Sequence, residues 1–244
     1  MIMASAPAYS DYTFSDPNPI KRVLQRSRLS HAMKLARTVH SPRAILDFGA
    51  GNGELCKLLR AAYPDARIFC YEPSAALMQE ARRNLACTDG IEFASASDAI
   101  EPGSADIIFC LEVFEHLPAK QTVDAFSSIA AALSQRGRLI IGVPIEIGIP
   151  ALYKGVFRMS RRYGAFDATL TNVLFCVAGR PPYRRPLCDA GDGLPYYAHH
   201  VGFDHRRFRS KLSKNFHIEA ASPAPTPMLG AMNPEIYFLC RHRH

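Results

Sequence analysis

One short segment near the start of the chain constrains the fold more than any other. An apolar run that begins at Ile45 contains Asp47, and glycines at positions 49, 51 and 53 follow before a helical pattern of leucines. Glycine tolerates the backbone angles of a sharp turn, and its missing side chain lets a ligand approach the backbone. A helix that starts there offers unpaired N–H groups. The segment therefore predicts a strand, turn and helix that hold an adenosine-containing ligand.

The spacing of the glycines narrows the choice of ligand. Dinucleotide-binding folds use the pattern G-x-G-x-x-G. This turn instead reads G-x-G-x-G, and Glu54 stands where the third glycine of the dinucleotide pattern would fall. A nicotinamide oxidoreductase is therefore disfavoured. A glycine-rich turn that binds no ligand stays an alternative on this motif alone.

Three further motifs follow in a defined order. A second apolar run, residues 67–71, ends at Glu72, and a carboxylate at that place can accept both hydroxyls of a ribose. The next motif contains Asp106, a buried strand pattern and then Glu115 and His116. Residues 137–144 form one more apolar run. The four motifs together resemble the class I (Rossmann-like) S-adenosylmethionine-dependent methyltransferases of the small-molecule type.

The resemblance covers about residues 45–143 strongly and about 200–241 weakly. The alternation of strand and helix patterns predicts an α/β fold with a parallel sheet. The resemblance implies a doubly wound, seven-stranded, mostly parallel sheet with helices on both faces and a C-terminal antiparallel hairpin. We expect helices at about 20–39, 53–63, 74–85, 119–134 and 204–214, and further strands at about 67–71, 91–94, 105–110, 138–143, 216–220 and 234–240.

Composition divides the chain into an arm and a single domain. Residues 1–19 are rich in Ala, Ser, Pro and Asp and are interpreted as an N-terminal arm, either a disordered tail or a cover for the cofactor. Residues 20–244 are expected to form one methyltransferase domain. Within it, residues 145–199 are unlike the core and are interpreted as an inserted acceptor-binding lid between strand five and the following helix. A surface elaboration or an oligomer contact is the alternative for this insertion.

The resemblance also implies where S-adenosylmethionine, and its product S-adenosylhomocysteine, would bind. The glycine turn would line the methionine and ribose, Glu72 would bind the ribose hydroxyls, and Asp47 would order the turn and meet the ammonium group. Asp98 would bond the adenine amine unless it is only a loop acid. The full predicted cofactor set is Asp47, Gly49, Ala50, Gly51, Gly53, Glu72, Pro73, Asp98, Leu111 and Glu112.

Three residues are candidates for removing a proton from the acceptor. Glu115 and His116 follow the fourth strand, and His200 lies next to His199 in the later part of the chain. Histidine accepts a proton near neutral pH. Packing or a helix start is an equally good interpretation for the first pair. A metal is not expected, because the side chains of adjacent histidines diverge and no third ligand is spaced nearby along the chain.

The charge of the chain is concentrated in one region. The net charge is +7, and residues 154–214 carry 12 Lys or Arg and 4 Asp. This region is either a solvated basic surface or a surface that attracts an anionic acceptor, a sugar-linked compound or a membrane face. No apolar run approaches the length of a transmembrane segment. The seven cysteines include no C-x-x-C pair, and no signal peptide is recognised, so we expect a cytoplasmic protein.

The motifs also restrict the acceptor. Base-amino methylases have an (Asp/Asn)-Pro-Pro-(Tyr/Phe) motif after strand four, where this chain has residues 111–114, Leu-Glu-Val-Phe. We therefore expect in-line methyl transfer to the hydroxyl or amine of a small molecule, with nucleic acid disfavoured as a partner. A protein or RNA methyltransferase that docks through residues 154–214, and a non-catalytic cofactor-binding scaffold, are the alternatives. The sequence leaves the oligomeric state open.

Overall fold

A seven-stranded sheet forms the centre of the molecule. The computed structural model describes residues 19–37, 39, 41–189 and 193–243, and for residues 19–26 only the backbone. The strands lie in the order β3-β2-β1-β4-β5-β9-β8. Their bounds are β1 (Ala44–Phe48), β2 (Arg67–Tyr71), β3 (Ile91–Ala94), β4 (Ala105–Leu111), β5 (Leu133–Pro144), β8 (Phe216–Ala224) and β9 (Glu235–His242).

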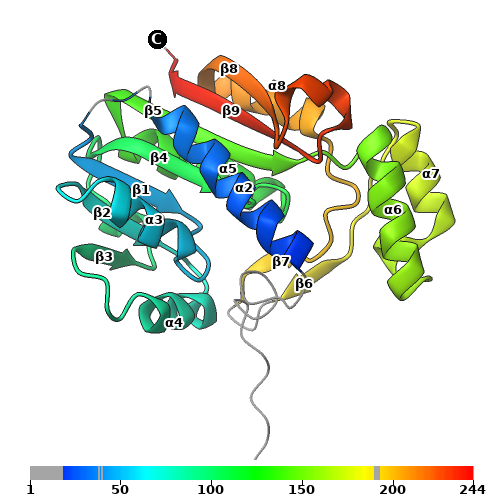
Figure 1. The fold of residues 1–244 in the computed structure, drawn as a ribbon, viewed down its shortest axis with the longest axis horizontal. Coiled ribbons are helices and arrows are strands. Elements are labelled where there is room, and N and C mark those ends of the chain that lie inside the picture. The colour runs from blue at the N-terminus through cyan, green and yellow to red at the C-terminus, as the bar shows by residue number, and fades with distance from the viewer. Residues whose placement is uncertain (1–18, 38, 40, 190–192, 244) are drawn as a thin grey trace, which may run out of the picture.

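The direction of the strands confirms the predicted fold class. Strands β1 to β5 are parallel, whereas β9 is antiparallel to both of its neighbours, β5 and β8. The sheet is therefore doubly wound and mostly parallel, and a C-terminal antiparallel hairpin closes it (Figure 1). A separate hairpin of β6 (Leu187–Asp189) and β7 (Pro195–Tyr197) lies apart from this sheet.

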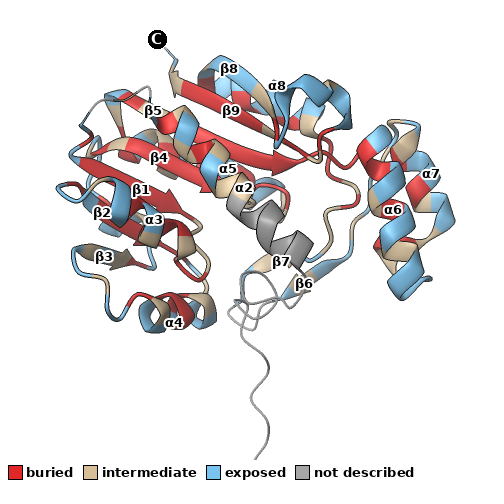
Figure 2. Ribbon diagram, viewed as in Figure 1, coloured by how far each residue is buried: buried red, intermediate tan, exposed pale blue. Residues whose placement is uncertain are grey.

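Helices cover both faces of the sheet, so the central strands are buried on both sides (Figure 2). Alternate residues of a strand point to opposite faces. Ile45 and Ile107 pack with α2 (Pro19–Ala36), α3 (Glu54–Ala62) and α4 (Ala75–Asn84), whereas Leu46 and Ile108 pack with α5 (Ala119–Ala132) and α8 (His205–Asn215). The hydrophobic clusters on the two faces of the sheet hold β1, β2 and β4 in place, and the carboxyl ends of these parallel strands lie at one edge of the sheet.

Some predicted boundaries are wrong. The helix predicted over about 119–134 ends at Ala132, and β5 begins at once at Leu133 rather than at 138. Leu133 pairs with Ala105 of β4, which extends β5, and its carbonyl accepts a hydrogen bond from the His242 side chain of β9. The predicted cap of α8 is confirmed, because the Asp204 carboxylate accepts a hydrogen bond of 2.9 Å from the backbone N–H of Arg206.

The insertion between β5 and α8 has its own helices. It contains α6 (Ile149–Arg162) and α7 (Leu170–Val177), which pack on each other and lie beside the sheet, followed by the β6–β7 hairpin (Figure 1). Among the described residues, no helix has both the length and the apolar content needed to cross a bilayer. The predicted arm, residues 1–19, falls almost wholly outside the described residues, and the lid role of 145–199 stays a prediction.

Candidate active site

The glycine turn folds back over the end of β2. The backbone N–H groups of Gly49 and Ala50 both donate to the carbonyl oxygen of Tyr71, each over 2.9 Å. The turn then leads into α3, whose N-cap is Gly53. This pairing of consecutive N–H groups with one carbonyl anchors the turn at the carboxyl edge of the sheet, where doubly wound folds bind their ligands.

The three glycines of the turn share a left-handed backbone but differ in what surrounds them. All three have positive φ, at 78° for Gly49, 55° for Gly51 and 79° for Gly53. A Cβ on Gly49 would lie 2.5 Å from Val113, in the loop after β4, and a Cβ on Gly53 would lie 2.6 Å from Leu85. A Cβ on Gly51 would meet no atom within 4 Å. Gly51 therefore borders open space, and its backbone is the part of the turn that a ligand can approach.

Glu72 is bonded directly to this turn. It is buried, and its carboxylate accepts a hydrogen bond of 2.9 Å from the N–H of Gly51 and another of 2.9 Å from the N–H of Ser74. Each carboxylate oxygen has a second lone pair for a ligand hydroxyl. Pro73, which follows, is exposed. The structure thus brings together the acid and the glycines that the sequence placed 21 residues apart.

Asp47 lies behind the turn in a buried position. The Cys56 thiol donates to its carboxylate over 3.4 Å. Burial, together with the charge of Glu72, raises the pKa of Asp47 to about 7 despite the bond from Cys56. Near neutral pH the Asp47 carboxyl is therefore close to half protonated, and a cation placed beside it would favour its ionised form.

The other predicted cofactor residues line the same edge. Asp98 is exposed in a short 3-10 helix, η1 (Ser97–Ala99). Burial of the Tyr71 hydroxyl raises the pKa of Tyr71, and the negative charges of Glu72 and Asp98 add to this shift. Leu111 ends β4, and Glu112 follows it with φ 56°, a left-handed conformation that is rare outside glycine. Strain of this kind is concentrated at ligand-binding sites.

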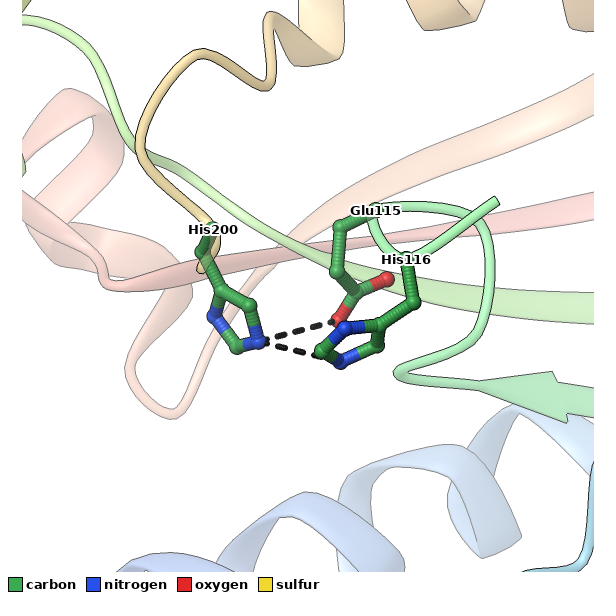
Figure 3. A group of neighbouring side chains, drawn as sticks. All are labelled: Glu115, His116 and His200. Atoms are coloured by element: carbon green, nitrogen blue, oxygen red, sulfur yellow. Dashed lines mark hydrogen bonds and ion pairs between the residues drawn. The ribbon is translucent and has the colours of Figure 1, made fainter. Parts of the chain in front are cut away.

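Glu115, His116 and His200 meet beside this edge (Figure 3). The Nε2 atoms of the two histidines are 3.2 Å apart, and Nε2 of His200 is 3.9 Å from Oε1 of Glu115. Along the chain, no third ligand is spaced near His199 and His200. The fold supplies the neighbours of His200 from a segment 84 residues away.

The β7 segment and Arg185 hold the cluster together. Tyr197 and His116 make two hydrogen bonds, one from the Tyr197 N–H to the His116 carbonyl over 2.8 Å and one from Nδ1 of His116 to the Tyr197 carbonyl over 2.7 Å. Arg185 lies over the Tyr197 ring and donates to the carbonyls of Glu115 and His199. Sequence reasoning did not find Arg185, because a single arginine in a Pro- and Arg-rich loop carries no signal of its own.

Burial controls the charge of the cluster. It raises the pKa of Glu115 well above its usual value, and the nearby Glu112 adds to this shift. Burial also lowers the pKa of His116 and of His200. The two imidazoles are therefore neutral at physiological pH, so that each has one ring nitrogen with a lone pair.

Part of the basic region is neutralised inside the protein. Glu146, which sequence reasoning also missed, is buried and bonds Lys154 over 2.9 Å and Arg158 over 2.8 Å. Burial opposes its ionisation, but these two cations lower the pKa of Glu146 to about 2. Buried Asp167 pairs in the same way with Arg162. The charge of residues 154–214 is therefore partly structural and not wholly a surface for partners.

The central part of the chain matches a known protein family. Residues 46–139 match the family of methyltransferase domains, which spans β1 to β5 and the glycine turn. Over these residues, less than half of its length, the chain is similar to methyltransferase domains. The resemblance seen in the four sequence motifs is confirmed.

Curated methyltransferases match this chain over the core of the sheet. A trans-aconitate 2-methyltransferase of Afipia carboxidovorans is 30% identical over 109 residues, which are 45% of this chain and 41% of that protein. A malonyl-acyl-carrier-protein O-methyltransferase of Anoxybacillus flavithermus is 31% identical over 123 residues, 47% of this chain and 44% of that protein. The matches thus span less than half the length of these curated relatives.

A solved methyltransferase structure shares the whole fold. The 1,6-didemethyltoxoflavin-N1-methyltransferase of Burkholderia thailandensis, with 1,6-didemethyltoxoflavin and S-adenosylhomocysteine bound, superposes with a TM-score of 0.57 at 14% identity. The match covers 100% of this chain and 94% of that one. At this low identity the likeness establishes the fold.

Proposed function

We propose that this protein transfers the methyl group of S-adenosylmethionine to a small-molecule acceptor. The observation that carries the proposal is the bond between the Glu72 carboxylate and the N–H of Gly51, on a turn that borders open space. An acid next to an open glycine turn is what a ribose and its attached chain require. The family assignment and the bound product in the Burkholderia enzyme support it.

The residues at this edge fit the cofactor. Glu72 would accept the ribose hydroxyls, the backbone of Gly51 would border the methionine chain, and Asp47 would ionise beside the ammonium group. Asp98 would bond the adenine amine from its exposed place after β3. S-adenosylmethionine, when bound, supplies an activated methyl group on a sulfonium cation. The protein mainly has to position the acceptor for in-line attack and exclude water.

The acceptor binds, in this proposal, beside Glu115, His116 and His200. A hydroxyl or protonated amine must lose a proton when it is methylated, and a neutral imidazole can accept it. The two curated relatives are named for acceptors with carboxyl groups, and residues 154–214 are basic. An anionic small molecule is therefore the acceptor class we favour.

The insertion 145–199 would act as the acceptor lid. Tyr197 and Arg185 already contact the loop after β4, so a movement of the β6–β7 hairpin would change the cluster directly. On α6 and α7, large apolar side chains are exposed, among them Leu152, Phe157 and Phe175. These side chains could cover an acceptor when the lid closes.

The proposal is tested by calorimetric titration of the purified protein. S-adenosylmethionine and S-adenosylhomocysteine should bind with micromolar affinity, and NAD should not bind. A methyl-transfer screen with labelled S-adenosylmethionine should then find label on an anionic hydroxyl or amine compound. Label on RNA or on a peptide, with binding that weakens steeply as salt increases, would contradict the small-molecule proposal and favour docking through residues 154–214. Cofactor binding without transfer to any of these classes would favour a scaffold.

A further inference from the structure

Two distant segments direct three ligand atoms to one point. Nε2 of His116, Nε2 of His200 and a carboxylate oxygen of Glu115 all lie within 4.8 Å of one another (Figure 3). We propose that these three residues bind a divalent transition-metal ion. The binding site does not depend on methyl transfer, whereas a role for the ion in catalysis would rest on the function proposed above.

The Glu115 carboxylate is buried and lacks a hydrogen-bond partner among the other described residues. Its side chain is wholly buried, and neither carboxylate oxygen accepts a hydrogen bond from any other residue that the structure describes. A buried carboxylate without a partner is costly, and proteins pair buried charges or place them on metals. Glu115 points toward the two imidazoles, so a cation between the three groups would provide the missing partner.

The second argument is the outer shell of the histidines. Histidines that bind metals usually donate their other ring N–H to a carbonyl or carboxylate, which fixes the tautomer. Nδ1 of His116 donates to the Tyr197 carbonyl over 2.7 Å, so its Nε2 carries the lone pair. Nδ1 of His200 lies 4.0 Å from the carboxylate of Glu146. The lone pair of His116 Nε2 is thereby directed toward His200, whereas the contact between His200 and Glu146 is longer than a hydrogen bond.

The distances suit an ion of this class. Metal–nitrogen bonds of about 2.0–2.1 Å place two ligand nitrogens about 3.3 Å apart in a tetrahedron and about 2.9 Å apart in an octahedron. The observed separation of the two Nε2 atoms, 3.2 Å, lies between these values. The separation of 3.9 Å between Oε1 of Glu115 and Nε2 of His200 is longer, and the three ligand atoms together span up to 4.8 Å, so the Glu115 carboxylate has to move toward the imidazoles when an ion binds.

The chemistry of the ligands selects the ion. Two imidazoles and one carboxylate suit Zn²⁺, Fe²⁺, Mn²⁺ or Co²⁺ better than Ca²⁺. Three protein ligands leave open positions on such an ion. An acceptor oxygen could occupy one of them, in which case the histidines would serve as ligands and not as proton acceptors.

The test uses Co²⁺ as a spectroscopic probe. Full-length, tag-free protein is stripped of metal with a chelator and titrated with CoCl₂, and the visible absorption of the bound ion is followed. We expect one equivalent to bind with micromolar or tighter affinity and to be displaced by one equivalent of ZnCl₂. Binding only at millimolar concentration, or at several equivalents without a defined spectrum, would overturn the proposal.

Variants locate the ion. His200→Ala and Glu115→Gln should each weaken Co²⁺ binding by at least about 100-fold, since even outer-shell changes cost about 10–100-fold. His199→Ala and His217→Ala are the matched controls, because His199 pairs with Asp167 and His217 is exposed on β8, and neither should change the affinity. Circular dichroism and the unfolding midpoint check that each variant is folded. Unchanged Co²⁺ binding in folded His200→Ala would overturn the site.

The outcome is separable from the proposed function. S-adenosylhomocysteine is titrated into the same metal-free and Co²⁺-loaded samples. Cofactor binding without Co²⁺ binding would overturn the metal site and leave the methyltransferase proposal intact. Co²⁺ binding at the three residues without any cofactor binding would support the metal site and contradict the methyltransferase proposal.

Discussion

Two buried glutamates at the same edge of the sheet differ sharply in their surroundings. Glu72 accepts hydrogen bonds from the N–H groups of Gly51 and Ser74, and so its carboxylate is stabilised before any ligand arrives. Glu115 is more deeply buried, and within the described part of the chain no other residue donates to its oxygens. The first acid is ready for a neutral, hydroxyl-bearing ligand, whereas the second requires a proton or a cation.

The difference follows from how each region is assembled. The Glu72 region is formed by a strand, a turn and the next strand, and backbone N–H groups are always available at such turns. The Glu115 region is formed where the insertion returns to the sheet, and its contacts join residues that are far apart along the chain. Four predictions test this contrast between a preformed cofactor region and an incomplete acceptor region, in decreasing order of effect.

The largest effect is expected from Glu72→Ala. Each hydrogen bond to a charged group contributes about 1.5–3 kcal/mol, so loss of two ribose contacts should weaken S-adenosylhomocysteine binding by about 100-fold or more. Calorimetry measures this, with His116→Ala as the control that should retain cofactor affinity. Normal binding by Glu72→Ala would show that the ribose assignment is wrong.

The next effect concerns Asp47 and pH. Because its folded-state pKa is raised to about 7 from 3.8, the folded protein binds more protons than the unfolded chain between these values, and stability falls as pH rises through them. Asp47→Asn cannot ionise. Its unfolding free energy relative to wild type should therefore rise by about 2–3 kcal/mol between about pH 5 and about pH 8. Denaturant titrations of ligand-free protein measure it, and a difference that does not vary with pH would refute it.

Two glycine substitutions separate folding from binding. Gly53→Ala places a Cβ 2.6 Å from Leu85 on a left-handed backbone, so overpacking of about 1–3 kcal/mol adds to a backbone cost of about 1 kcal/mol. Gly51→Ala meets no atom within 4 Å, so only its left-handed backbone should cost stability, about 1 kcal/mol. Gly51→Ala should nevertheless weaken cofactor binding. If the two variants lose equal stability and both keep the cofactor affinity of the wild type, no ligand binds beside Gly51.

The smallest effect is expected from Arg185→Lys. Lysine cannot donate to the carbonyls of both Glu115 and His199 while stacking on Tyr197. Co²⁺ affinity should fall by about tenfold, as for other outer-shell changes, while S-adenosylhomocysteine affinity stays constant. A fall in both affinities would show that the two regions are coupled and not separate.

Much of this arrangement was predictable because its signals are local. Short apolar runs predicted the strands, and the glycine spacing with Glu72 predicted a turn and an acid at one edge, which the structure brings into direct contact. The start of β5 was not predictable, because pairing of Leu133 with Ala105 extends that strand beyond its own apolar pattern. The buried partners of the basic residues, Glu146 and Asp167, were missed because acids carry no signal of burial in the sequence.

The sequence by itself determined the order of the elements, the resemblance to methyltransferase domains and the glycine turn, since these depend on residues close together along the chain. Only the tertiary structure decided which groups share the acceptor end. His200 reaches Glu115 and His116 because the insertion leaves the sheet after β5 and returns along β7, where Tyr197 bonds His116. That path is set by packing and by the buried ion pairs of Glu146 and Asp167, which act between residues that no local pattern connects.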